Sequence, residues 1–135
     1  MTSELIERLE KAESGSRELD REMAELFGWQ LKMPHGFWLA PKGWKPLSPM
    51  EGLPYFTTSL DAIVSLIGEK LPGWTWAAGP RTYGEDWDLA WARIYPHRSQ
   101  ADGTGNKYAK TVPLALCIAL LRAIQASQGS ETDGR

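Results

Sequence analysis

The chain has 135 residues, a length that fits one domain with its own core, because a chain of this size can bury roughly two thirds of its unfolded surface. Hydrophobic residues make up 42% of the sequence and charged residues 24%, which argues against a disordered chain. The 15 basic and 17 acidic residues give a net charge of −2, which argues against a binder of the DNA backbone, and the single cysteine excludes a disulfide framework.

The sequence pattern predicts neither a membrane span nor a secretion signal. The longest uncharged apolar run, residues 112–121, is far shorter than the roughly 20 residues of a spanning helix. Residues 1–5 lack the basic and apolar parts of a signal peptide. We therefore expect a cytoplasmic protein in which Cys117 stays reduced.

Two short helices are predicted over residues 4–28. The first covers residues 4–13, with Ser3 as its N-cap, and the second follows the N-cap Ser16 and ends at Gly28. Neither helix is long enough to be stable alone in water, so we expect both to pack on the rest of the domain as a helical hairpin. Their many charged side chains are interpreted as a solvated helical face.

Residues 29–54 are rich in proline, glycine and tryptophan, and they are predicted to form a long loop. Its only predicted strand is 36–40. Loops of this length inside compact domains are often functional. We interpret Trp29, Trp38 and Trp44 as candidates for a lid or a partner surface.

The core of the domain is predicted over residues 55–126. The elements expected there are a helix over 57–70 with the capping pattern Thr58–Asp61, antiparallel strands over 74–78 and 86–95, and an apolar central helix over 112–126. Residues 96–110 are expected to be a polar loop, and 127–135 a disordered tail. The order α-α-β-α-β-β-α predicts one α+β domain, 1–126, with a small antiparallel sheet of about three strands flanked by helices.

Several stretches carry a family resemblance: Leu5–Glu10, Arg17–Asp20, Leu53–Ala62, Pro72–Trp74 and Lys110–Ala123. In these stretches the chain resembles small uncharacterised proteins of tailed phages and prophages, of the phage ABA-sandwich type. The resemblance covers most of residues 4–126 in order, and it implies an aromatic-rich sheet between helices and a phage origin. The chain departs from the pattern at Val112 and at 106–109. The shared motifs are helix caps and core helices, so the resemblance transfers no catalytic residue.

The loop before the last predicted helix is a candidate anion site. A helix N-terminus offers unpaired N–H groups and a partial positive charge. Gly103 and Gly105 allow close approach of a ligand, Lys107 and Lys110 add positive charge, and the Thr111 hydroxyl adds a donor. The spacing is not that of a P-loop. The alternative is a flexible hairpin loop in which Thr111 is an ordinary N-cap.

The seven tryptophans suggest a second candidate site, on the strand predicted over 86–95. Trp87, Trp91 and Tyr95 share one face of this strand, with Arg93 between them. Such a face can stack a nucleobase while the arginine pairs with a phosphate. The alternative is that a helix covers this face as part of the core.

Signals for metal binding and catalysis are weaker. The acidic cluster 85–88 lacks the spacing of a calcium loop, and His35 and His97 lack the spacing of a zinc site. Cys117 lies in an apolar helix, where a thiolate is disfavoured. We therefore expect no metal and no cofactor, and the sequence favours a binding protein over an enzyme.

These observations favour a non-catalytic, phage-encoded protein of the host cytoplasm. It would bind a small nucleotide-like anion and thereby sequester a signal of host defence. We expect it to bind neither a membrane nor a nucleic-acid polymer. The alternative is a protein-interaction module that binds a host or phage protein, or homodimerises, through the tryptophan-rich loop 29–54. A third hypothesis, a small hydrolase that uses His97 or the acidic cluster 85–88, rests on residue type alone.

Overall fold

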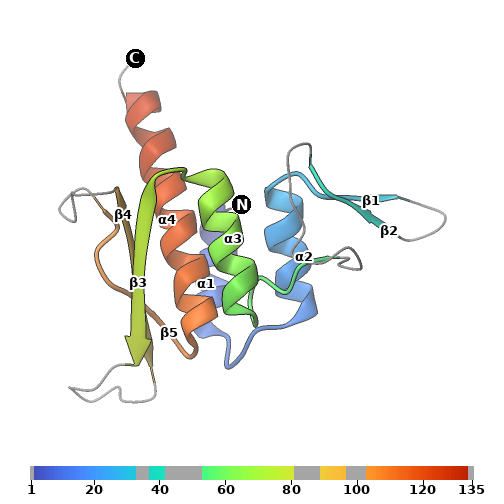
Figure 1. Cartoon of the computed structure of the whole chain (residues 1–135), viewed down its shortest axis with the longest axis horizontal. Helices are drawn as coiled ribbons and strands as arrows, with labels where there is room; N and C mark the ends of the chain where they lie inside the picture. The colour runs from blue at the N-terminus through green and yellow to red at the C-terminus, as the bar shows by residue number, and fades with distance from the viewer. Residues whose placement is uncertain (1, 33–36, 42–52, 81–88, 97–102, 134–135) are drawn as a thin grey trace.

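The computed structural model describes residues 2–32, 37–41, 53–80, 89–96 and 103–133. Within these ranges the chain forms an α+β fold (Figure 1), which confirms the predicted class. The helices are α1 (Thr2–Lys11), α2 (Arg17–Leu26), α3 (Leu60–Lys70) and α4 (Val112–Asp133). The strands are β1 (Gln30–Lys32), β2 (Phe37–Leu39), β3 (Trp74–Pro80), β4 (Ala90–Pro96) and β5 (Lys107–Ala109). They form two antiparallel sheets, β1–β2 and β3–β4–β5.

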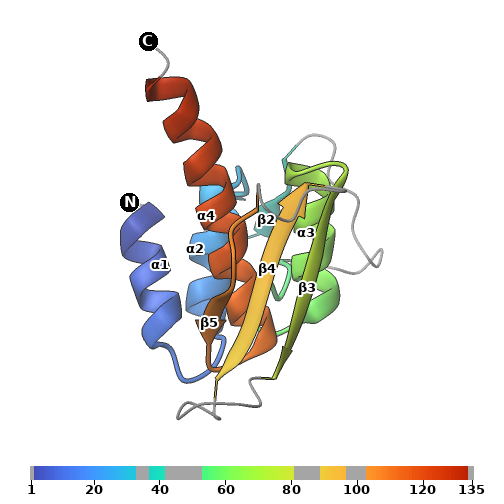
Figure 2. The same ribbon diagram turned by 90° about the vertical axis from the view of Figure 1, so that its left-hand side faces the viewer.

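Helix α4 is the centre of the fold, as its apolar sequence predicted. Residues 114–121 are all completely buried. One side of α4 packs on β4 and β5, while α1 and α3 lie on either side of it (Figure 2). An apolar surface around the whole helix is stable only when neighbours cover it on every side, which explains this position. None of the helices in the described ranges is both long enough and apolar enough to cross a bilayer.

The alternation of residues along β4 separates the two faces of the larger sheet. Ala90, Ala92 and Ile94 are buried against the helices, so the residues between them project from the opposite face, which we call the outer face. Figure 2 shows the outer face toward the viewer, with the described helices behind the sheet. The family resemblance implied a sheet between helices, but all the helices in the described ranges lie on one face.

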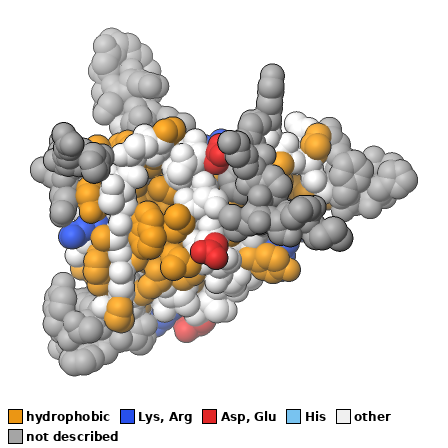
Figure 3. Space-filling view, in the orientation of Figure 1, with side chains coloured by type: hydrophobic (Ala, Val, Ile, Leu, Met, Phe, Trp, Pro, Cys, Tyr) orange, Lys and Arg blue, Asp and Glu red, His pale blue; other side chains and the backbone are white. Residues whose placement is uncertain are grey.

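Strand β3 lies at the edge of this sheet and contributes to both faces. Trp76 pairs with Ile94 and therefore lies on the helix-facing side of the sheet. Trp74 and Trp76 both pack against the core, and both side chains are half-buried. In the space-filling view hydrophobic side chains are visible around β3 and α3 (Figure 3). Trp74 and Trp76 therefore lie at the edge of the hydrophobic core, partly buried against it.

Two short strands were not predicted. β1 pairs with β2, which lies inside the predicted strand 36–40, and β5 lies in the predicted polar loop 96–110. Three residues are too few to show a period of two, so only pairing with a neighbouring strand defines these segments as strands. The described part of the second long strand begins at Ala90, and residues 86–88 of its prediction lie outside the described ranges.

Helix boundaries follow the caps. Ser16 Oγ accepts a hydrogen bond from Leu19 N–H at 3.1 Å, and Gly28 has a φ of +101°, as the sequence predicted for α2. The predicted start of the third helix was wrong. Ser59, rather than Thr58, is the N-cap of α3, because its Oγ accepts from Ala62 N–H at 3.3 Å.

The last helix is longer than predicted. α4 continues to Asp133, so residues 127–133 are helical in backbone, where a disordered tail was expected. This stretch contains no proline, and extending an existing helix requires no new nucleation step.

Trp29 belongs to the core, which corrects its interpretation as a lid or partner surface. Its side chain is 4% exposed, and its ring meets Phe56 edge-on at 5.4 Å between centroids. Trp38 is half-buried and also packs against the core cluster, while Trp44 lies outside the described residues. Trp29 and Trp38 therefore pack the first part of the segment 29–54 against the core of the domain.

Candidate ligand-binding face

The outer face of the three-stranded sheet brings aromatic residues together. We call Trp91, Arg93, Tyr95 and Tyr108 the aromatic face. The first three project from β4, because alternate residues of a strand point to the same side. Tyr108 of β5 is paired with Trp91 and therefore shares this side. Trp87, which the sequence grouped with these residues, lies outside the described ranges.

Arg93 lies between two aromatic rings. Its guanidinium carbon is 5.5 Å from the centroid of the Trp91 ring and 5.9 Å from that of Tyr95. Both distances are within the range of a cation–π interaction. The Arg93 Nε atom is buried and has no hydrogen-bond partner among the described residues. An unsatisfied buried donor costs about 1–3 kcal/mol, so this group calls for a functional or structural explanation.

The neighbouring strand is lined with small residues opposite these rings. Gly79 pairs with Trp91, and Ala77 pairs with Arg93. A Cβ atom added to Gly79 would lie 3.3 Å from the indole Nε1 of Trp91, so the indole leans across the β3 backbone at this glycine. The Trp91 indole thus occupies the space that Gly79 leaves on β3, and it is half-buried there.

At the start of α4, which was considered from the sequence as an anion site, most of the first N–H groups are already used or absent. Thr111 Oγ1 accepts from Leu114 N–H at 3.3 Å, and the Thr111 carbonyl accepts from Ala115 N–H at 3.0 Å. Pro113 has no N–H group. Among the first three helical positions, therefore, only the Val112 N–H is left for a ligand. The Thr111 hydroxyl is the acceptor of an ordinary N-cap, as in the alternative considered from the sequence.

The glycine and lysine residues before α4 also have structural positions. Gly103 packs directly on β4, where a Cβ atom would collide with the Ile94 carbonyl and with Tyr95. Gly105 is exposed and forms a turn with a φ of +70°. Lys107 pairs with Ala92 and therefore leaves the sheet on the helix-facing side, opposite to Arg93. Lys110 follows β5 and is half-buried. The structure thus joins Trp91 and Arg93 but does not bring Lys107 to their face.

The candidate metal and hydrolase residues lie elsewhere. The acidic cluster 85–88, His35 and His97 all fall outside the described residues. No group of three or more metal-ligating side chains is present in the part of the chain that the structure describes.

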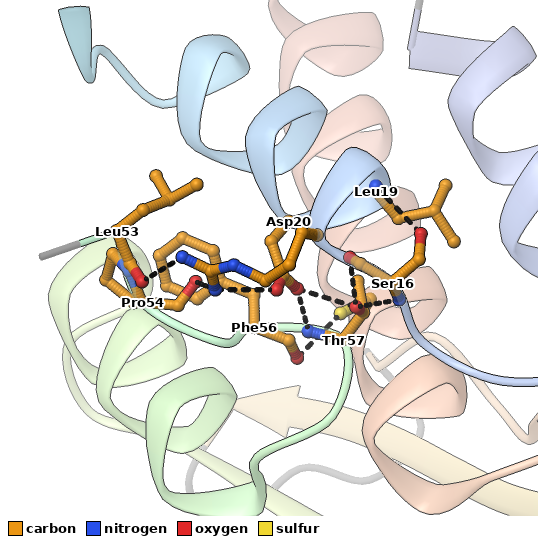
Figure 4. A network of polar contacts seen from close by, with 9 residues as sticks. Ser16, Leu19, Asp20, Leu53, Pro54, Phe56 and Thr57 are labelled. Atoms are coloured by element: carbon orange, nitrogen blue, oxygen red, sulfur yellow. Dashed lines mark hydrogen bonds and ion pairs between the residues drawn. The ribbon is translucent and has the colours of Figure 1, made fainter. Parts of the chain in front are cut away.

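A buried polar network, which the sequence pattern did not indicate, joins α2 to the segment before α3 (Figure 4). Asp20 Oδ1 accepts from the backbone N–H of Thr57 at 2.8 Å and from its hydroxyl at 2.6 Å. Asp20 Oδ2 accepts from Arg17 Nη1 at 2.9 Å. Arg17 also donates to the carbonyls of Leu53 at 2.8 Å and Pro54 at 3.3 Å.

This network is structural. Asp20 and Thr57 are both 0% exposed, so neither can reach a ligand on the surface. Thr57 Oγ1 also accepts from Ser16 N–H at 3.0 Å, which ties the N-cap of α2 to the same site. The network therefore fixes where the chain crosses beneath α2 before it enters α3.

Cys117 lies beside this network and is not a nucleophile. It is completely buried, and its Sγ donates to the Phe56 carbonyl at 3.4 Å. Burial raises the pKa of the Cys117 thiol well above its usual value, and the negative charge of Asp20 raises it further. A thiolate is therefore disfavoured, in agreement with the expectation from the sequence.

We expect Cys117 in the native protein not to react with a disulfide reagent at pH 8, and one thiol per chain to react after denaturation. The raised pKa in the folded state also predicts a pH dependence of stability. The contribution of the buried thiol to the free energy of unfolding is fully present below the pKa of the unfolded thiol, about 8.5. This contribution is lost as the pH rises above that value, because the unfolded thiol then ionises while the buried one does not. Denaturant melts between pH 7 and pH 10 measure this trend, and a Cys117→Ala variant should show less of it. Rapid native labelling would contradict the buried position.

Comparisons of the sequence with protein-family models, and of the chain with curated proteins and solved structures, find no match. The resemblance to phage proteins therefore stays a prediction, and the geometry of the aromatic face is the basis on which a function can be proposed.

Proposed function

We propose that this protein is a non-catalytic binding protein, and that its aromatic face receives a flat, anionic ligand of the nucleotide class. One observation carries the proposal: the guanidinium of Arg93 lies between two aromatic rings, on a sheet face that none of the described helices covers. Aromatic rings offer stacking surfaces for a planar base, and an arginine offers donors to a phosphate.

The half-buried position of Arg93 supports this proposal; its Nε atom is buried, so the terminal Nη groups are the donors that a ligand would meet. A guanidinium that is partly removed from water and flanked by rings is weakly hydrated and already oriented. An anion that bonds to it gains more than it would from a fully solvated arginine, because less water has to be displaced. The neighbouring side chains Trp91 and Tyr95 supply stacking rather than acid–base chemistry, so binding suits this face better than hydrolysis.

The biological setting of this proposal comes from the resemblance alone. If the chain is of phage origin, a protein that holds a nucleotide-like signal would lower its free concentration in the host cytoplasm. Sequestration of a host-defence signal is therefore our proposal for the role of such binding.

Removal of the central cation tests the proposal. We expect AMP to bind the native protein with saturation in a tryptophan-fluorescence titration, and Arg93→Ala to weaken this binding by about tenfold or more, since a hydrogen bond to a charged group contributes about 1.5–3 kcal/mol. Arg21→Ala is the matched control, because it removes the same charge from an exposed position on α2. Equal losses in the two variants, or no saturable binding of AMP, ADP or ATP, would overturn the proposal.

A second candidate function is supported by the β1–β2 hairpin. Leu31 and Leu39 on this hairpin are 46% and 48% exposed, and Leu26 at the end of α2 is 41% exposed. Leu31 pairs with Trp38 and Leu39 pairs with Gln30, so the two leucines leave opposite faces of the hairpin, and an interface on either face would bury one of them. We propose self-association through this hairpin as the alternative function, with leucines rather than tryptophans as its anchors.

Light scattering distinguishes this alternative. A hairpin interface predicts a mass above the 15.1 kDa of one chain, and a Leu31→Glu/Leu39→Glu double variant should return the mass to that of the monomer. A native protein that is monomeric at high concentration would count against self-association.

A further inference from the structure

The aromatic face has an order along β4: a ring, a cation and a second ring. Trp91, Arg93 and Tyr95 are alternate residues of the strand, so all three leave it on the same side. The guanidinium is 5.5 Å from one ring centroid and 5.9 Å from the other, so the two centroids are at most about 11 Å apart. Their Cα atoms are separated by four strand residues, roughly 13 Å. Along β4, the two aromatic residues lie one on each side of Arg93 in the chain.

This spacing matters for the size of the ligand. Adjacent bases in a duplex are stacked about 3.4 Å apart, which is too close for each to lie on a separate ring of this face. Two bases that are splayed apart, with their linking phosphate between them, have the same order as the residues: base, anion, base. Proteins that bind single strands commonly hold splayed bases on aromatic side chains in this way.

The charge on the face limits the number of phosphates. Among the described positions of the outer face, which are Thr75, Ala77, Gly79, Trp91, Arg93, Tyr95 and Tyr108, Arg93 is the only charged residue. One arginine matches one phosphodiester. A longer strand would place further phosphates beside described positions of this face that carry no second cation, on a protein whose net charge is −2.

We infer that the ligand class of this face is a dinucleotide, in which one base stacks on Trp91, the other stacks on Tyr95, and the bridging phosphate accepts hydrogen bonds from Arg93. The inference rests on the proposed function and makes it more specific. A mononucleotide uses one ring and the cation, and leaves the second ring without a partner. The two-ring arrangement therefore selects for a ligand with two bases.

The experiment compares the dinucleoside monophosphate ApA with AMP by isothermal calorimetry. We expect ApA to bind about 5- to 150-fold more tightly than AMP, because stacking of a second base contributes about 1–3 kcal/mol. Trp91→Ala and Tyr95→Ala should each remove most of this advantage of ApA. Tyr95→Phe should retain it, since the ring is kept. An ApA analogue with an uncharged methylphosphonate link should bind the native protein as weakly as ApA binds Arg93→Ala.

The possible outcomes separate the two proposals. Equal affinities for AMP and ApA would overturn the dinucleotide inference and leave nucleotide binding in place. Absence of binding by either compound would overturn both. An oligonucleotide of 20 nucleotides provides a further test. If it binds much more tightly than ApA and with a steep salt dependence, the face binds polymers and the inference is overturned. Thermal melts of each variant confirm that a loss of binding is not a loss of folding.

Discussion

Asp20→Ala is expected to lower the free energy of unfolding by about 3–4 kcal/mol, the largest effect that we predict for a single substitution. The carboxylate accepts two hydrogen bonds from Thr57 and one from Arg17, and both Asp20 and Thr57 are completely buried. Without it, the backbone N–H of Thr57 loses its acceptor in a place that water does not reach, while the Thr57 hydroxyl keeps only the Ser16 carbonyl, at 3.1 Å, as a partner. Arg17 contributes less to this cost, because its side chain is 46% exposed and can be hydrated instead.

Chemical denaturation with urea measures this loss. Asp61→Ala is the matched control: Asp61 is an exposed acidic residue in the first turn of α3, and its removal should change stability by no more than about 0.5–1 kcal/mol. A double-mutant cycle with Thr57→Val isolates the contact, and we expect a coupling free energy of about 1–3 kcal/mol between the two residues. A loss in Asp20→Ala no greater than that in Asp61→Ala would contradict the network.

Gly15→Ala is expected to destabilise the protein by about 2–3 kcal/mol, which is typical of an overpacked site. A Cβ atom at position 15 would overlap the backbone carbonyl of Thr57, so the connection between α1 and α2 would have to move away from this segment. The obstacle is backbone, which a change of rotamer cannot relieve. The displacement would also strain the hydrogen bond from Ser16 N–H to Thr57 Oγ1.

Gly68→Ala provides the control for this prediction. Gly68 lies in α3 and is exposed, and a Cβ atom added there would meet no other side chain or neighbouring segment within 4 Å. Alanine at this position should therefore raise stability by up to about 1 kcal/mol. The two glycine variants should shift the thermal midpoint in opposite directions. A Gly15→Ala protein that is as stable as the native protein would show that the α1–α2 connection is not packed on Thr57.

The sequence predicted the helices well because their signals are local. Ser16 and Gly28 bound α2 as expected, and the apolar surface of α4 is buried as expected. In α3, Ile63 and Ile67 are buried, while Leu60 at its start is 41% exposed. Caps and helical periodicity depend on residues within a few positions of one another. The same locality explains the shifted start of α3, where Thr58 and Ser59 are both able to cap and only the packed chain selects between them.

The candidate site was predicted in part. The strand pattern placed Trp91, Arg93 and Tyr95 on one face, and the structure has them there. Tyr108 was missed because its three-residue strand is defined only by pairing with β4. Lys107 was predicted in the anion loop before the last helix, and the register of β5 turns it to the side of the sheet opposite to Arg93.

Asp20 shows the limit of local patterns most directly. It lies in a charged helix whose composition indicates a solvated face, but its partner Thr57 is 37 residues away along the chain. The sequence by itself determined the α+β class, the central helix and the order of ring and cation along β4. Tertiary structure decided which face of the sheet the helices cover, where β5 joins it and which acid is buried, because each of these depends on contacts between segments that are distant in sequence.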